Sequence, residues 1–158
     1  MRKHRKGHPS RPSAPGMKVY WDTSAIIWYF GRGGLGEIRG VTRPHTLSET
    51  FSALTGGGFE LVMPDGTRKH WRLSLRAASA VVSRFYPQLE YVELSANEIV
   101  AALQTAKDKG AQGGRVHDLM HAVAGEKAGA DELWTIDEND FVGLGKVPLK
   151  YLADTPAT

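Results

Sequence analysis

Short apolar runs alternate along this chain with segments whose apolar residues recur every three or four positions. Runs typical of β-strands cover residues 18–22, 41–45, 89–94, 132–136 and 147–152. Patterns typical of helices cover residues 24–30, 46–54, 74–86, 95–109 and 115–128. Because strands that alternate with helices favour a parallel sheet covered by helices, the pattern predicts an α/β sandwich.

Two of the expected helices carry more detailed signals. Thr23 or Ser24 is expected to cap the first helix, since both follow the first strand and have hydroxyl side chains. In the helix at 46–54, Leu47, Phe51 and Leu54 are spaced as one apolar stripe.

One segment adds a hairpin to the alternation. Residues 59–62 and 69–73 are both prone to form strands, and Asp65 and Gly66 lie between them. An Asp-Gly pair in this setting favours a tight turn, so we expect an inserted β-hairpin over residues 59–73.

Charge is distributed unevenly. The chain has 158 residues, with 20 Lys and Arg and 17 Asp and Glu. Five of the basic residues and none of the acids lie in residues 1–16, among Pro, Ser and Gly. This composition predicts a disordered basic tail ahead of a single domain over residues 17–158. Two interpretations of the tail stay open: Met17 is the true start, or the tail is a solvated arm that contacts nucleic acid through its charge.

The composition also excludes several classes of protein. Without cysteine there is no disulfide, thiolate zinc site or thiol nucleophile. No apolar run approaches the roughly 18 residues of a membrane span, and the basic N-terminus has no apolar stretch behind it. We therefore expect a cytoplasmic protein that does not contact a membrane.

Acidic residues follow two of the expected strands. Asp22 ends the first strand and Asp137 follows the fourth, at the edge where open parallel sheets bind ligands. Glu49 lies off the apolar stripe of its helix, and Asp118 lies in the first turns of a largely apolar helix. Taken singly, these acids are ordinary turn formers, solvated side chains or carboxylates at a helix N-terminus. Four converging carboxylates would instead require a hard divalent cation, Mg²⁺ or Mn²⁺, which suits phosphodiester hydrolysis.

Four segments carry a resemblance to a known family. They are VYWDTSAII, HTLSETFSAL, GGRVHDLMHAVAGEKAGADELWTIDENDF and VPLKYL. In this order they resemble the successive motifs of PIN domains, and in particular small bacterial PIN proteins such as VapC-type toxins. The resemblance extends from Met17 to about Leu152.

The resemblance implies a metal-dependent endoribonuclease whose acids lie at the carboxyl edge of a five-stranded parallel sheet. The acids implied for catalysis and for binding Mg²⁺ or Mn²⁺ are Asp22, Glu49, Asp118 and Asp137. Asp140 matches a flanking position and is implied to support the metal through a water. Thr23, Ser24 and Thr135 match polar positions beside the acids. The hairpin is a departure from a minimal domain of this kind.

The resemblance and the right-handed crossover rule together predict a three-layer α/β/α sandwich with strand order 3-2-1-4-5. This order would place Asp22 and Asp137 after adjacent central strands. The resemblance also implies a homodimer that binds RNA, with Lys107, Lys109 and Arg115 and the hairpin's Arg68, Lys69 and Arg72 as candidate contacts.

Arg115 and His117 precede Asp118 and are candidates to contact an RNA phosphate. His121 lies one turn beyond His117, which is a metal-like spacing, but a histidine so placed is more often packed in the core or at its rim. The tryptophans expected to pack in the core are Trp21, Trp28, Trp71 and Trp134.

Several functions compete. The first is a toxin ribonuclease with a cognate antitoxin as partner. The alternatives on the same fold are an RNA-processing nuclease without an antitoxin and a non-catalytic RNA-binding module. A phosphoacceptor signalling domain fits poorly, because it needs an acidic pair after the first strand, where Asp22 stands alone, and an acceptor after the third, where Ser95 follows.

Overall fold

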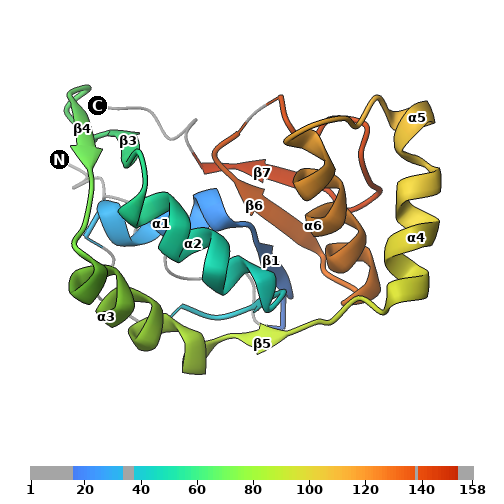
Figure 1. The fold of residues 1–158 in the computed structure, drawn as a ribbon, viewed down its shortest axis with the longest axis horizontal. Coiled ribbons are helices and arrows are strands. Elements are labelled where there is room, and N and C mark those ends of the chain that lie inside the picture. The colour runs from blue at the N-terminus through green and yellow to red at the C-terminus, as the bar shows by residue number, and fades with distance from the viewer. Residues whose placement is uncertain (1–15, 34–37, 138, 153–158) are drawn as a thin grey trace, which may run out of the picture.

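Five parallel strands form the central sheet, and helices cover both of its faces (Figure 1). The computed structural model describes residues 16–33, 38–137 and 139–152. The strands of this sheet are Val19–Trp21 (β1), Val41–Thr42 (β2), Glu90–Tyr91 (β5), Glu132–Thr135 (β6) and Leu149–Tyr151 (β7). The α-helices are Thr23–Gly31 (α1), His45–Thr55 (α2), Leu75–Phe85 (α3), Ala96–Gln104 (α4), Ala106–Lys109 (α5) and Arg115–Lys127 (α6). A short 3₁₀ turn, Tyr86–Gln88 (η1), follows α3.

The sheet has the order β5-β2-β1-β6-β7. Written in chain numbers this is 5-2-1-6-7, which differs from the expected 3-2-1-4-5. The two orders are numbered differently. The expected order counts only the five strands of the sheet, whereas the third and fourth strands of the chain form the hairpin and pair only with each other. In the central sheet, β1 and β6 are neighbours, with Trp21 opposite Trp134. Asp22 and the residues that follow β6 therefore leave the same edge of the sheet.

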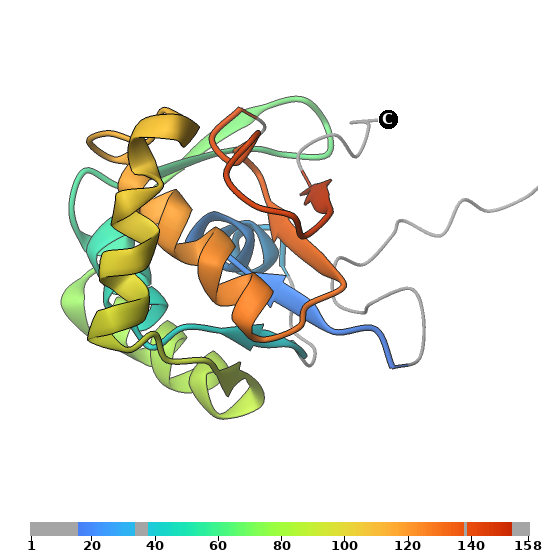
Figure 2. The same cartoon turned by 90° about the vertical axis from the view of Figure 1, so that its right-hand side faces the viewer.

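Successive side chains of β1 point to opposite faces of the sheet, and each face has its own part of the hydrophobic core. Val19 and Trp21 pack with α1 and with Phe85 of α3, whereas Tyr20 packs on the other face with residues of α4 and α6. The pairing of α4 with α6 on that face can be followed in Figures 1 and 2. Three of the tryptophans, at 21, 28 and 134, are buried as expected, and Trp71 is partly buried against the same core.

The expected hairpin is confirmed as an antiparallel pair, Phe59–Val62 (β3) and Arg68–Trp71 (β4). Gly66 turns the chain with a φ of 85°, a conformation that favours glycine. Leu61 fixes the hairpin to the body, because it is 2 % exposed and packs at the end of α1. A Cβ atom on Gly31 would overlap the end of the Leu61 side chain, so any other residue there would have to displace Leu61.

Several sequence expectations need correction. Asp22, and neither Thr23 nor Ser24, caps α1: its extended backbone precedes the first turn and its carboxylate accepts from the Ala25 amide. The stripe of α2 is confirmed, with Leu54 buried and Leu47 and Phe51 partly buried against the core, and the helix also buries Thr46 and Thr50.

The helix expected over 95–109 is divided at Thr105 into α4 and α5. A capping box begins α4, in which the Ser95 and Glu98 side chains each accept from the other residue's backbone amide. The expectations for the basic tail fall almost entirely on residues 1–15, which lie outside the described part of the chain. In the described part, no helix has the length and apolar character needed to cross a membrane.

Candidate acidic site

Asp22 is the innermost of the predicted acids. It is 3 % exposed, and its Oδ1 accepts a 2.7 Å hydrogen bond from the Ala25 amide at the start of α1. Ser24 Oγ lies 2.8 and 2.9 Å from the two carboxylate oxygens. Burial raises the pKa of Asp22, although the nearby His121 and these hydrogen bonds act in the opposite direction. Asp22 is thus held in one orientation beyond the end of β1.

Asp137 lies just past β6, beside Asp22, as its strand position predicts. The Asp137 amide donates to Thr135 Oγ1 at 3.1 Å, so the last residue of β6 sets the direction of the chain here. Partial desolvation raises the pKa of Asp137 to about 6, helped by the charges of Asp22 and Asp140, although the residue as a whole is exposed. Asp140 is also exposed, and its amide donates to the Asp137 carbonyl oxygen.

Asp118 is presented by the first turn of α6 and is partly buried. Desolvation raises the pKa of Asp118 to about 7. The charges that add to this shift belong, in decreasing order, to Asp140, Asp22, Asp137 and Glu49. The structure therefore brings the other four predicted acids within electrostatic reach of Asp118, although they come from separate parts of the chain.

Glu49 of α2 differs from the three aspartates at 22, 118 and 137. Burial alone would raise its pKa, but electrostatic interactions with His121, Thr23 and His45, including hydrogen bonds, outweigh burial and lower the pKa of Glu49. Thr23 Oγ1 donates to its Oε2 at 3.1 Å. Its buried Oε1 lies 3.3 Å from His121 Nε2 and 3.4 Å from His45 Nε2, without a well-aligned hydrogen bond.

The histidines around Glu49 were only partly anticipated from the sequence. His121 is 2 % exposed and also lies 2.7 Å from the Tyr20 hydroxyl, so it is both packed and hydrogen-bonded. His45 precedes Glu49 by four residues, a helical spacing that could have revealed the pair. The ring of exposed His117 stacks on His45, with centroids 6.0 Å apart. Tyr20 is 101 residues from His121, and no local pattern links them.

Arg115 makes contacts within the protein that the sequence did not predict. Its guanidinium donates to the carbonyl oxygens of Asp140 and Val142, at 3.3 and 2.6 Å. Arg115 therefore fixes the loop that carries Asp140 to the start of α6. Its contact with an RNA phosphate stays a prediction.

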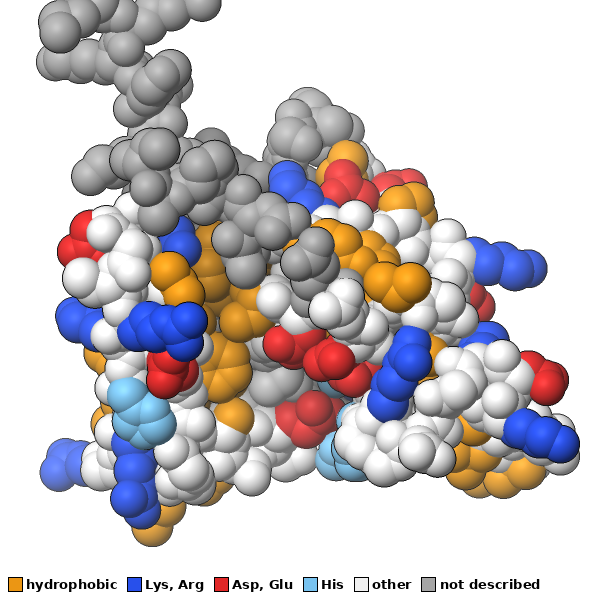
Figure 3. All heavy atoms as spheres, turned by 90° about the horizontal axis from the view of Figure 1, so that it is seen from above, with side chains coloured by type: hydrophobic (Ala, Val, Ile, Leu, Met, Phe, Trp, Pro, Cys, Tyr) orange, Lys and Arg blue, Asp and Glu red, His pale blue; other side chains and the backbone are white. Residues whose placement is uncertain are grey.

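Figure 3 shows how charge is arranged on this face of the molecule. Asp and Glu side chains gather around a hollow near its middle, with His beside them and Lys or Arg toward both flanks. The acidic side chains offer oxygen atoms, the ligands that hard divalent cations prefer. One of these atoms, the buried Oε1 of Glu49, has no hydrogen-bond partner among the described residues. Within the described residues, however, no three His, Asp or Glu side chains are arranged to hold a metal ion. Metal binding would therefore have to draw the carboxylates closer together.

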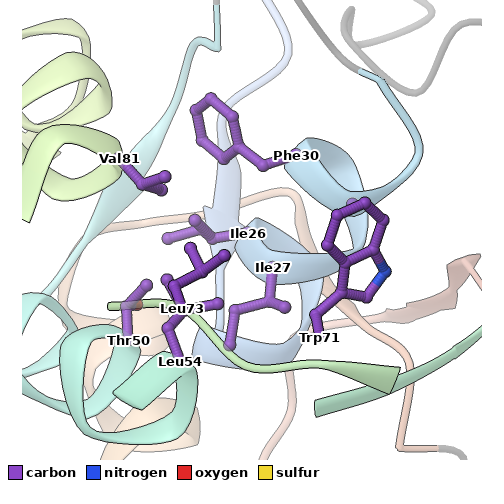
Figure 4. A pocket seen from close by; sticks show the side chains of 9 residues that line it. Ile26, Ile27, Phe30, Thr50, Leu54, Trp71, Leu73 and Val81 are labelled. Carbon is purple, nitrogen blue, oxygen red and sulfur yellow. The ribbon is translucent and has the colours of Figure 1, made fainter. Parts of the chain in front are cut away.

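A separate apolar cavity of about 200 Å³ lies between α1, α2, α3 and the end of the hairpin (Figure 4). Its lining residues are Ile26, Ile27, Phe30, Gly31, Thr50, Leu54, Trp71, Leu73 and Val81. None of these has a carboxylate or imidazole group, so the cavity does not provide the chemistry that the acids suggest.

No model of a known protein family matches the chain, and neither a curated protein nor a solved structure shows significant similarity to it. The likeness to PIN domains therefore rests on the sequence motifs, and the functional argument rests on the acids themselves.

Proposed function

We propose that this chain is a PIN-type, metal-dependent ribonuclease that hydrolyses phosphodiester bonds of RNA. The observation that carries the proposal is the convergence of Asp22, Glu49, Asp118 and Asp137 at one edge of the sheet. Desolvation raises the pKa values of Asp118 and Asp137, and repulsion from neighbouring carboxylates adds to both shifts. A site with this excess of negative charge favours a cation.

In this proposal Asp22, Asp118 and Asp137 bind Mg²⁺ or Mn²⁺, and Asp140 supports them through a water. When bound, the cation would polarise a phosphoryl oxygen and lower the pKa of a water molecule. Glu49 stays ionised because its neighbours lower its pKa, so it is suited to orient the attacking water or to complete the metal's ligands. Ser24 and Thr135 keep Asp22 in place.

A non-catalytic RNA-binding module is the second candidate, and the arrangement of the acids favours it in one respect. The described carboxylates are not preassembled around an ion. Calorimetric titration with Mn²⁺ separates the two candidates. The nuclease proposal predicts binding that Asp118→Asn weakens and the exposed Glu90→Gln leaves unchanged. Parent protein that binds no Mn²⁺ would support the module instead.

We further propose that the cellular role is that of a toxin with a cognate antitoxin, with RNA processing as the alternative. A small adjacent gene for a DNA-binding protein would favour the toxin. We also propose a homodimer, and light scattering that shows a monomer at micromolar concentration would contradict it.

A further inference from the structure

Three polar side chains lead from the buried face of the sheet to the acidic site. The Tyr20 hydroxyl of β1 lies 2.7 Å from Nδ1 of His121 in α6. Nε2 of the same ring lies 3.3 and 3.4 Å from the two carboxylate oxygens of Glu49. Tyr20 is fully buried and His121 almost so. Buried polar groups are costly unless they are hydrogen-bonded, so each member of this line depends on the next.

The acceptors and donors in the line determine where its protons lie. An ionised carboxylate can only accept hydrogen bonds, so the Nε2 that faces Glu49 must carry a proton. In a neutral imidazole Nδ1 is then an acceptor, and the Tyr20 hydroxyl donates to it.

Packing holds the two rings in the same arrangement. The Tyr20 and His121 rings meet edge to face, with centroids 5.7 Å apart and planes inclined by 65°. Gly125, one turn beyond His121, lies against Tyr20, and a Cβ atom there would be 3.5 Å from Tyr20 Cγ. The direction of the imidazole is thus set by its surroundings as well as by its hydrogen bonds.

We propose that Tyr20 and His121 are positioning residues for Glu49. Tyr20 holds the imidazole with Nε2–H toward the carboxylate, and His121 holds that carboxylate from its buried side. Thr23 and His45 contact the same carboxylate from α1 and from α2 itself. The inference rests on the proposed nuclease function, because it assumes that Glu49 orients the attacking water or completes the metal's ligands.

Two substitutions of His121 separate positioning from packing. A Gln side chain places its amide near the position of Nε2 and can donate to Glu49, whereas Asn places its amide near Nδ1 and cannot reach Glu49. We expect His121→Asn to lower kcat on RNA about 10- to 100-fold with little change in KM, as loss of an outer-shell partner does. We expect His121→Gln to retain most of kcat. Equal losses in the two variants would overturn the proposal, because they would show that His121 only fills space.

Coupling to Glu49 provides a second kinetic check. In a Glu49→Gln background, His121→Asn should lower kcat little further, because the group that it positions is already changed. Full additivity of the two losses would contradict positioning.

A spectroscopic measurement needs no RNA and no metal. The ¹⁵N signals of the His121 ring at pH 8 should show the Nε2–H form in the parent, and Tyr20→Phe should change this signal. Tyr91→Phe also removes one phenol hydroxyl, from an exposed contact with the Tyr86 carbonyl oxygen, and should leave the signal unchanged. A parent ring protonated at Nδ1 alone, or a signal unaffected by Tyr20→Phe, would overturn the proposal. If the parent has no nuclease activity, the nuclease function fails and this measurement still decides how His121 is held.

Discussion

Thr135 Oγ1 donates a 2.7 Å hydrogen bond to Oδ2 of Asp22, from the end of β6 to the end of its neighbour β1. The same oxygen accepts from the Asp137 amide at 3.1 Å. One hydroxyl therefore orients two acids of the candidate site. Thr135 is completely buried, so no solvent replaces either contact.

Replacing Thr135 by Val should test this link. The change keeps the shape but removes the hydroxyl, which leaves the Asp137 amide without its partner and Oδ2 of Asp22 with the Ser24 hydroxyl alone. We expect the free energy of unfolding to fall by about 1–3 kcal/mol, the usual cost of such a buried group. We also expect a loss of roughly tenfold or more in RNA cleavage, as for other outer-shell partners. Denaturant unfolding and kinetics measure the two effects. Thr135→Ser retains the hydroxyl, so it should keep cleavage and lose only the stability of one buried methyl group, about 1 kcal/mol. Equal behaviour of the Val and Ser variants would contradict the role of the hydroxyl.

The raised pKa values predict how the metal-free protein responds to pH. The pKa of Asp118 is about 7 and that of Asp137 about 6 in the folded state, against an ordinary value of 3.8. The folded state therefore binds more protons than the unfolded state above about pH 4, and stability falls as pH rises through 6 and 7. Calorimetry in EDTA should show a lower Tm at pH 8 than at pH 5.

Asp118→Asn is the matched comparison for this pH effect, because histidines titrate in both proteins. The variant should lose less Tm between pH 5 and pH 8, and at pH 8 it should melt at or above the temperature of the metal-free parent. Glu98, whose pKa is lowered to about 2 by Lys127 and Ser95, acts below this range and in the opposite direction. Identical pH profiles for parent and variant would contradict a raised pKa of Asp118 in the folded state.

Cations of the hairpin are expected to contribute to RNA affinity. Lys69 and Arg72 are exposed, and the Lys69 ammonium lies 5.1 Å from the centre of the Trp71 ring. Changing both to Gln should weaken RNA binding in EDTA and reduce the salt dependence, by about 0.7 in log–log slope for each lost phosphate contact with a single strand. Fluorescence anisotropy measures both quantities.

A control for the hairpin variant is provided by Lys18 and Lys127. Lys18 precedes β1 and Lys127 is the last residue of α6, so both lie at the edge of the sheet opposite the acidic site. Changing these two to Gln removes the same charge and should leave RNA affinity nearly unchanged. An equal loss in both double variants would mean that net charge, rather than the hairpin, governs binding.

Much of the fold could be predicted from the sequence because its signals are local. The spacing of apolar residues indicated the helices, and Asp65 with Gly66 indicated the hairpin. The apolar stripe of α2 was predicted correctly, since Leu47, Phe51 and Leu54 all pack in or against the core. The two buried threonines of this helix were missed, because periodicity detects only apolar residues. Thr46 and Thr50 are buried there with their hydroxyls satisfied, Thr46 accepting from Thr42 and Thr50 donating to the Thr46 carbonyl oxygen.

The candidate site was predictable only where strand ends determine position. Asp22 and Asp137 follow β1 and β6, and the pairing of these strands brings them to one edge. Tyr20 and His121 were not linked in advance, because the contact of a strand with a distant helix depends on packing across the sheet. Glu49 was assigned to the site by resemblance alone. Its contacts with Thr23, His45 and His121 became evident only from the fold.

Cleavage of single-stranded RNA by highly purified protein tests the central claim most directly. The parent should cleave in Mg²⁺ or Mn²⁺, stop in EDTA and recover when the metal is restored. At equal metal, Asp22→Asn and Asp118→Asn should each lower the rate by about 10²–10³ or more, because each loses a charged oxygen at the reacting centre. Glu90→Gln, which changes an exposed acid at the start of β5, should cleave like the parent. Activity that persists in EDTA or in both aspartate variants would contradict the account.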